Sequence, residues 1–233
     1  IRNINIAYNF PQSLMSKISF ISNCRLMNTK NVVLMGMFGA LAAVLMLFEV
    51  PLPFLAPSFY GLDFAEVPML VGTFALGPVA GIVMQIVKIL IKLILKPTST
   101  GFVGEFANVV MSCALILPAG FIYRFKKSKN GALAGMAVGT VLMAVAGVVM
   151  NALVMIPFYS NFMPIETIIK AGAAVNPAVS SVWTLAIFCV GPFNLVKGTL
   201  TSVITAVIYK RISVLIHGAS HGTSGSYGVK KAV

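Results

Sequence analysis

The amino-acid sequence predicts an all-α integral membrane protein with six transmembrane helices and both termini in the cytoplasm. Of its 233 residues, 58% are hydrophobic and only 9% are charged, whereas a soluble domain carries about 25% charged residues. Several apolar stretches approach the roughly 20 residues that cross a bilayer as a helix. The net charge of +12 gathers at the flanks of these stretches, as expected of cytoplasmic loops, which makes nucleic-acid binding a poor explanation of the basic charge.

The six predicted spans cover residues 32–50, 64–77, 79–95, 102–123, 131–156 and 192–209. The second is short, and the sequence ALGPVAG predicts a tight turn before the third. A further apolar stretch, 178–190, allows a seventh span. The basic residues favour six, because six spans place Lys30, Lys126–Lys129 and Lys210-Arg211 on one side of the membrane. Residues 157–190 are then expected to form an external connection with short helices.

The two ends of the chain are expected to lie outside the membrane domain of residues 30–213. Met27 precedes a run typical of a native start, so residues 1–29 are interpreted as an N-terminal extension, partly non-native or disordered. Residues 214–233 are rich in glycine and serine and are expected to form a flexible tail.

Several classes of protein are excluded by what the sequence lacks. Both histidines, His217 and His221, lie in the tail, so the membrane part has none for a metal cage or a serine–histidine pair. The three cysteines show no CxxC spacing, and no phosphate-binding G-x-x-x-x-G-K-[ST] motif occurs. We therefore expect neither an enzyme nor a resident metal or cofactor, and any energy from ATP must come through another protein.

Polar residues inside the predicted spans converge on the outer half of the bundle. Glu105 and Asn108 begin the fourth span and Asn151 ends the fifth, while the third span carries Lys88, Lys92 and Lys96 on one face. Such residues usually mark a substrate path. They also allow mutual pairing, for example of Glu105 with Lys88 or Lys92, or snorkelling of Lys96 to the interface.

The segment GPFNLVKG, residues 191–198, is the least expected within an apolar run. We interpret Pro192 as part of the first turn of the sixth helix, where no backbone N–H is needed. Asn194 and Lys197, three residues apart, then point into the same outward cavity. This set suits a neutral, hydrogen-bonding small molecule better than an inorganic ion.

The first external loop, residues 49–68, is rich in proline and aromatic residues. Proline stiffens the loop, and its aromatic side chains are able to cover a flat ring. The alternative is a rigid turn with an interfacial aromatic belt.

Small residues recur at four-residue spacing in the first and fifth spans, at Gly36/Ala40, Gly39/Ala43 and Gly131/Gly135/Gly139. Such positions let helix backbones approach closely. They either pack within the bundle or form a face for another membrane protein.

The motifs LMLFEVPLPFLAPSFYGLDFAEVP, GFVGEFANVV, MNALVMIPFY and PFNLVKG, in this order, resemble the riboflavin-specific S components of energy-coupling factor (ECF) vitamin transporters. The resemblance covers roughly residues 30–213 and implies six helices, an outward riboflavin site and a first loop that closes over the ligand. It implies that Asn151, Asn194 and Lys197 contact the isoalloxazine ring. The full expected set of substrate-binding residues is Asn151, Asn194, Lys197, Glu105, Asn108, Asp63, Leu62, Phe59 and Lys88.

The resemblance also implies partners and a location. Riboflavin would be a transported ligand rather than a cofactor, and transport would require a transmembrane T component and two ATPase subunits in the plasma membrane of a prokaryote. The small residues of the first helix, which the family uses to dock the T component, are here Gly36, Gly39, Ala40 and Ala43.

Two other functions stay open at this point. An S component for thiamin, folate or biotin would need a different set of charges, since a cation favours acidic and aromatic residues and a dicarboxylate favours arginine. An ion-coupled secondary carrier of a small neutral metabolite would need a proton site, for which Glu105 with Lys88 is the candidate.

Overall fold

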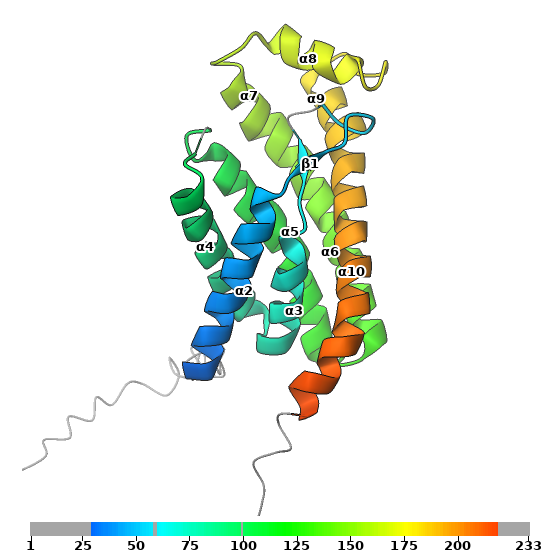
Figure 1. Cartoon of the computed structure of the whole chain (residues 1–233). Coiled ribbons are helices and arrows are strands. Elements are labelled where there is room, and N and C mark those ends of the chain that lie inside the picture. The colour runs from blue at the N-terminus through cyan, green and yellow to red at the C-terminus, as the bar shows by residue number, and fades with distance from the viewer. Residues whose placement is uncertain (1–28, 58–59, 99, 219–233) are drawn as a thin grey trace, which may run out of the picture.

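The computed structural model describes residues 29–57, 60–98 and 100–218, and in this part of the chain the fold is a helix bundle (Figure 1). Residues 1–28 of the predicted N-terminal extension and residues 219–233 of the predicted tail lie outside the described residues. The helices are α2 (Thr29–Leu47), α3 (Glu66–Leu76), α4 (Pro78–Leu95), α5 (Val103–Phe125), α6 (Lys129–Met150), α7 (Ile156–Tyr159), α8 (Ile165–Ala173), α9 (Val182–Leu185) and α10 (Gly191–Gly218), with π-helical turns η2 (Asn151–Met155) and η3 (Ala186–Val190).

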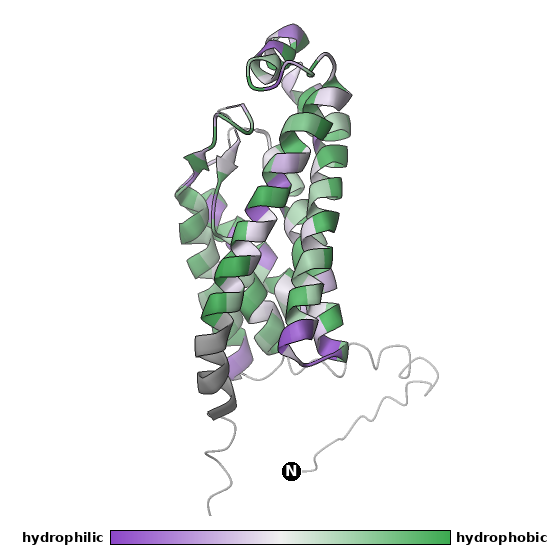
Figure 2. Cartoon of the chain, turned by 90° about the vertical axis from the view of Figure 1, so that its right-hand side faces the viewer, coloured by the Kyte–Doolittle hydropathy of each residue, from purple (hydrophilic) through white to green (hydrophobic). Residues whose placement is uncertain are grey.

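Five helical segments within the described ranges are long and apolar enough to cross a membrane. They are Thr29–Leu47, Pro78–Leu95, Val103–Phe125, Lys129–Tyr159 and Val182–Ile208. Large apolar side chains such as Met37, Leu133 and Val207 are exposed on them, and hydrophobic residues cover the bundle over most of its length (Figure 2). This is the surface expected of a helix bundle that faces lipid, so the predicted all-helical, multi-pass membrane fold is confirmed.

Helix α3 is shorter than these five segments and lies inside the bundle, where it contacts α2, α4, α5 and α10. Every residue from Glu66 to Phe74 is buried. The turn between α3 and α4 is made by Gly77, whose φ of 100° is unfavourable for other residues, followed by Pro78 in the first turn of α4. The tight turn expected from ALGPVAG is therefore present.

The described chain begins and ends at the same end of the bundle, and α8 lies at the opposite end (Figure 1). We call these the terminal end and the α8 end. The first loop, between α2 and α3, contains a short antiparallel ladder of β1 (Val50–Pro51) and β2 (Gly61–Leu62). Residue 61 must be glycine for this ladder to close, because a Cβ there would lie 2.7 Å from the Cβ of Glu49.

The last long helix begins earlier than its sequence predicts. Ser181 caps it through a reciprocal pair of hydrogen bonds with Thr184, and the helix continues through α9, η3 and α10. The expectation that Pro192 lies in a first helical turn is therefore wrong, and so is the expected external connection up to residue 190. Only the segment around α8 separates Tyr159 from this cap.

The two π-helical turns explain how proline is tolerated inside long helices. The N–H of Ile156 donates to the carbonyl of Asn151, and the N–H of Gly191 donates to that of Ala186. A single residue separates each of these wide turns from a proline, Pro157 or Pro192. A proline ring clashes with the carbonyl four residues before it in a regular α-helix, and a π-helical turn relieves that contact.

The small-residue stripe of α6 packs within the protein. A Cβ on Gly135 would lie 2.9 Å from the carbonyl oxygen of Ala119, and one on Gly139 would lie 2.4 Å from that of Leu115. Both acceptors belong to α5, so this stripe closes the α5–α6 contact.

A buried ion pair joins α3 and α4 in the core. The Lys88 ammonium donates to Glu66 Oε1 at 2.9 Å and to Ser112 Oγ at 3.1 Å, and the Ser112 hydroxyl also donates to Glu66. Lys88 is fully buried and Glu66 is 1% exposed. Lys88 therefore pairs with Glu66 and not with Glu105.

We predict that Lys88→Met destabilises the protein by about 3–5 kcal/mol, because it leaves the buried Glu66 carboxylate without its cation. Thermal unfolding of the detergent-solubilised protein measures the loss. The double variant Glu66→Gln/Lys88→Met removes both charges and should recover most of the stability. A single variant as stable as the parent would show that the pair is not needed for folding.

Candidate functional site

A cavity of about 470 Å³ lies between the first loop, helices α4, α5, α7, α8 and α10, and the turn η2. Six of the predicted substrate-binding residues line it: Asn151, Asn194, Lys197, Glu105, Asn108 and Asp63. Of the other three, Phe59 lies outside the described residues. Leu62 is buried in an apolar cluster with other residues of the first loop, and Lys88 pairs with Glu66 in the core.

The wide turn η2 presents Asn151 to the cavity. Its Nδ2 donates to the carbonyl oxygen of Gly147 at 2.8 Å, and its Oδ1 accepts from the Tyr60 hydroxyl at 2.6 Å. Burial raises the pKa of the Tyr60 hydroxyl, so this group stays protonated and acts as a donor. One N–H of the Asn151 carboxamide is left for another partner.

Asn194 lies in α10, four residues after the end of the π-helical turn η3, and is 3% exposed. Its Nδ2 donates to the carbonyl oxygen of Val190 at 3.0 Å. Among the described residues, no group donates a hydrogen bond to its Oδ1. The Asn194 carboxamide therefore has an acceptor to offer in the cavity wall.

Lys197 lies one turn further along α10 and is held by the first loop. Its ammonium donates to Asp63 Oδ2 at 2.7 Å, and Asp63 Oδ1 accepts from the backbone N–H of Ala65 at the start of α3. Burial alone would raise the pKa of Asp63, but the charge and hydrogen bond of Lys197 outweigh it and lower that pKa. The carboxylate stays ionised, and two donor positions of the ammonium remain for other partners.

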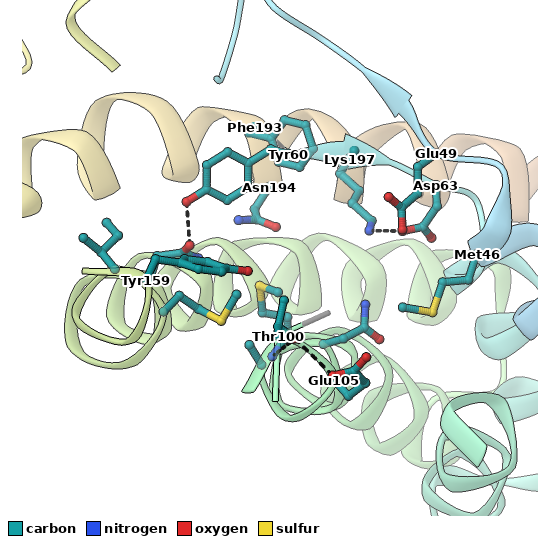
Figure 3. A pocket seen from close by; sticks show the side chains of 18 of the residues that line it. Met46, Glu49, Tyr60, Asp63, Thr100, Glu105, Tyr159, Phe193, Asn194 and Lys197 are labelled. Carbon is teal, nitrogen blue, oxygen red and sulfur yellow. Dashed lines mark hydrogen bonds and ion pairs between the residues drawn. The ribbon is translucent and has the colours of Figure 1, made fainter. Parts of the chain in front are cut away.

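The first loop is therefore tied to both helices that carry the predicted ligand contacts (Figure 3). Tyr60 binds Asn151 and its ring lies 5.9 Å from that of Phe193, while Asp63 binds Lys197. Sequence reasoning included Tyr60 only as one of several loop aromatics. The sequence gives little indication of this role, because a tyrosine in a loop rich in proline and phenylalanine is typical of a membrane interface.

Glu105 is bound on the opposite wall, at the start of α5. Its carboxylate accepts from Lys92, from Thr98 at 3.0 Å and from Thr100 at 3.2 Å. Of the two pairings expected for Glu105, the structure has the one with Lys92. Next to it, Asn108 Oδ1 accepts from Gln85 Nε2 at 3.3 Å, which leaves the Asn108 amide hydrogens available.

The charges of the cavity lining balance. The lining carries three lysines (Lys92, Lys96 and Lys197) and three carboxylates (Glu49, Asp63 and Glu105). Two ion pairs join Lys92 to Glu105 and Lys197 to Asp63. The rest of the wall is largely apolar, from Met46, Met111, Met155, Ile156, Tyr159, Met163, Ile168 and Phe193. Such a cavity favours a neutral molecule with an apolar body and a few hydrogen-bonding groups. No cluster of three or more metal-ligating side chains occurs in the part of the chain described.

Comparisons with known proteins agree with this arrangement. A solved structure of the S component of a bacterial ECF transporter superposes with a TM-score of 0.63 at 29% identity, over 80% of this chain and 97% of that one. The riboflavin transporter RibU of Staphylococcus aureus (strain TCH60) is 29% identical over 184 residues, 79% of this chain and 90% of the relative. The riboflavin transporter FmnP of Bacillus subtilis (strain 168) is 28% identical over 189 residues, 80% and 93% of the two chains.

These proteins are named as transporters or transporter components, which confirms that the chain is not an enzyme. The family model for the substrate-specific component of ECF transporters matches residues 30–209. The chain therefore belongs to the family of ECF transporter substrate-specific components.

Proposed function

We propose that this chain is the riboflavin-binding S component of an ECF importer in the plasma membrane of a prokaryote. The observation that carries the proposal is the convergence of Asn151, Asn194 and Lys197 on one charge-balanced cavity. Two relatives that each match about four-fifths of the chain are named riboflavin transporters, which supports the choice of ligand.

The hydrogen-bonding groups of the cavity match the polar edge of a flavin. The pyrimidine edge of riboflavin presents an acceptor, a donor and an acceptor in order. In Figure 3, Asn194 lies between Tyr60, which binds Asn151, and Lys197. The N–H of Asn151, the Oδ1 of Asn194 and the ammonium of Lys197 thus offer a donor, an acceptor and a donor.

The other parts of riboflavin have suitable partners too. The apolar end of the ring system would pack on methionine and aromatic side chains of the wall, such as Met111, Met155 and Phe193. The hydroxyl groups of the ribityl chain need polar partners, and Asn108, Thr100 and Glu105 line the opposite wall.

We propose six spans, with α3 as a short second span and the terminal end in the cytoplasm. Lys30, Lys126, Lys127 and Lys129 lie at the helix ends of that side, as the positive-inside rule requires. The cavity then opens to the outside, and the two π-helical turns lie in the outer half of the membrane.

Transport is proposed to use a T component and two ATPase subunits, since the chain has no nucleotide-binding motif. The docking face on α2 is narrower than its sequence suggests. Gly39 and Ala43 are buried, and a Cβ on Gly39 would lie 2.8 Å from Val87 of α4. Gly36 has no neighbour within 4 Å of its Cβ position and Ala40 is partly exposed, so we assign docking to these two.

The proposal predicts that the purified chain binds one riboflavin without ATP. Titration of the detergent-solubilised protein should quench flavin fluorescence, whereas thiamin and biotin should not compete. Asn194→Ala should weaken binding by about three- to tenfold, the usual worth of one neutral hydrogen bond. The matched control is Asn161→Ala, at an exposed position. Tighter binding of thiamin or biotin than of riboflavin would overturn the assignment of the ligand.

We predict that Lys197→Met weakens riboflavin binding by about tenfold to a hundredfold, the loss of a charged hydrogen bond of about 1.5–3 kcal/mol. It should also lower thermal stability without ligand, because Asp63 is left buried and unpaired. Asp63→Asn/Lys197→Met should restore stability without restoring affinity. Parental affinity in that double variant would limit Lys197 to a structural role.

Ala40→Trp should leave riboflavin binding within about twofold but abolish riboflavin uptake, because its bulk blocks close helix approach. Uptake is measured in cells that co-express the T and ATPase subunits. Val141→Trp, at an exposed position of α6, is the control and should transport normally. Normal uptake by Ala40→Trp would place the docking face elsewhere.

A further inference from the structure

Gly147, on α6, lies where the two cavity carboxamides come together. It is buried one helical turn before Asn151, and its carbonyl oxygen accepts the hydrogen bond from Asn151 Nδ2 at 2.8 Å. This bond decides which way the Asn151 carboxamide faces, together with the bond from Tyr60 to the amide oxygen.

The missing side chain of Gly147 makes room for the other carboxamide. A Cβ at this position would lie 2.4 Å from Asn194 Nδ2 and 3.0 Å from its Cγ. Real Cβ atoms essentially never approach another heavy atom so closely. The Asn194 carboxamide therefore packs directly on the α6 backbone, which keeps Nδ2 in reach of the Val190 carbonyl.

Glycine is otherwise a poor choice at this position. Inside a helix it is less favourable than alanine, because it loses more conformational freedom on folding. Gly147 has no positive φ that would require glycine. What it offers is space for Asn194 and a carbonyl for Asn151.

We propose that Gly147 is a positioning residue for riboflavin binding, acting through both carboxamides. It seats Asn194 so that Oδ1 is offered to the ligand, and it anchors the Asn151 amide so that an N–H is offered beside it. The inference rests on the proposed function, because it concerns the same cavity and ligand. Gly147 does not line the cavity. Through the two carboxamides it nevertheless controls which hydrogen-bonding groups face the ligand.

The effect of adding a methyl group follows from which atom is displaced. The nearest atom is the far end of the Asn194 side chain rather than backbone, so rotation of that side chain relieves the overlap. Helices α6 and α10 then stay in contact, while the Asn194 carboxamide leaves its place. Gly147→Ala should therefore affect affinity more than folding.

The test is a double-mutant cycle on the full chain in detergent, with Gly147→Ala, Asn194→Ala and both together. Riboflavin affinity is measured by fluorescence quenching and stability by thermal unfolding without ligand. Gly147→Ala should weaken binding by about three- to tenfold, the worth of one hydrogen bond. In the Asn194→Ala background it should cause little further loss, because the side chain it displaces is gone.

The control is Gly191→Ala, a buried helical glycine three residues before Asn194. Its Cβ would lie 3.4 Å from Val148 Cγ2, an ordinary contact. This variant should keep parental affinity and stability, which separates the position of Gly147 from a general effect of alanine in these helices.

The outcomes separate this inference from the function on which it rests. If Asn194→Ala weakens binding but Gly147→Ala does not, the inference is wrong and the proposed function stands. Equal losses from Gly147→Ala in both backgrounds would also overturn it, since the effect would then act through helix packing. If Gly147→Ala is unstable, Asn194→Ala must restore stability by removing the overlap, and failure to do so overturns the close contact. Unchanged affinity in Asn194→Ala would contradict the proposed site itself.

Discussion

A lysine inside an apolar helix bundle needs a negative partner, and for Lys197 that partner is Asp63 on the first loop. Taking two charges out of water is costly, and the cost is recovered only when geometry is good and the remaining hydrogen-bonding positions are used. Asp63 meets this condition through Lys197 and the N–H of Ala65. The pair fixes the loop onto α10 and the start of α3 beside the same cavity, so the shape of the site depends on it.

The two asparagines owe their places to local helix geometry. Asn151 opens one π-helical turn and Asn194 follows the other, and each donates to a carbonyl four residues before it in the chain. A π-helical turn adds a residue and changes the register of the helix that follows. In the sequence, each proline suggests that a helix ends or begins there. In the structure, each proline instead follows a widened turn inside a continuous helix.

Composition and charge predict the fold of this chain well, because lipid imposes simple demands on length and polarity. The segments 79–95 and 102–123 match α4 and α5 within a few residues. The start of the last helix was missed because the Ser181–Thr184 cap is a short polar signal, whereas Gly191-Pro192 is a strong one. Periodicity shows which face of a helix is polar but not which partner it meets, so the pairing of Lys88 with Glu66 needed the three-dimensional arrangement of α3 and α4.

The same limit applies to the candidate site. Asn151, Asn194 and Lys197 stand out in the sequence because polar residues in apolar helices are rare and usually functional. Tyr60 and Gly147 do not, since a loop tyrosine and a helix glycine are common in membrane proteins. Their roles arise from contacts between segments far apart in the chain, Tyr60 with Asn151 and Gly147 with Asn194, and no spacing rule reports such contacts.

A site built in this way selects ligands through the cost of mismatch. The two carboxamides are anchored by backbone carbonyls and Lys197 by Asp63, so the wall cannot easily turn its donors and acceptors to suit a different molecule. A ligand that lacks one complementary group leaves a buried polar atom unpaired, which costs more than a lost apolar contact. The two ion pairs of the lining add a second condition, because each would have to be separated before its charges could pair with a charged ligand. Rigid polar anchors in an otherwise apolar cavity thus provide selectivity without any chemical step.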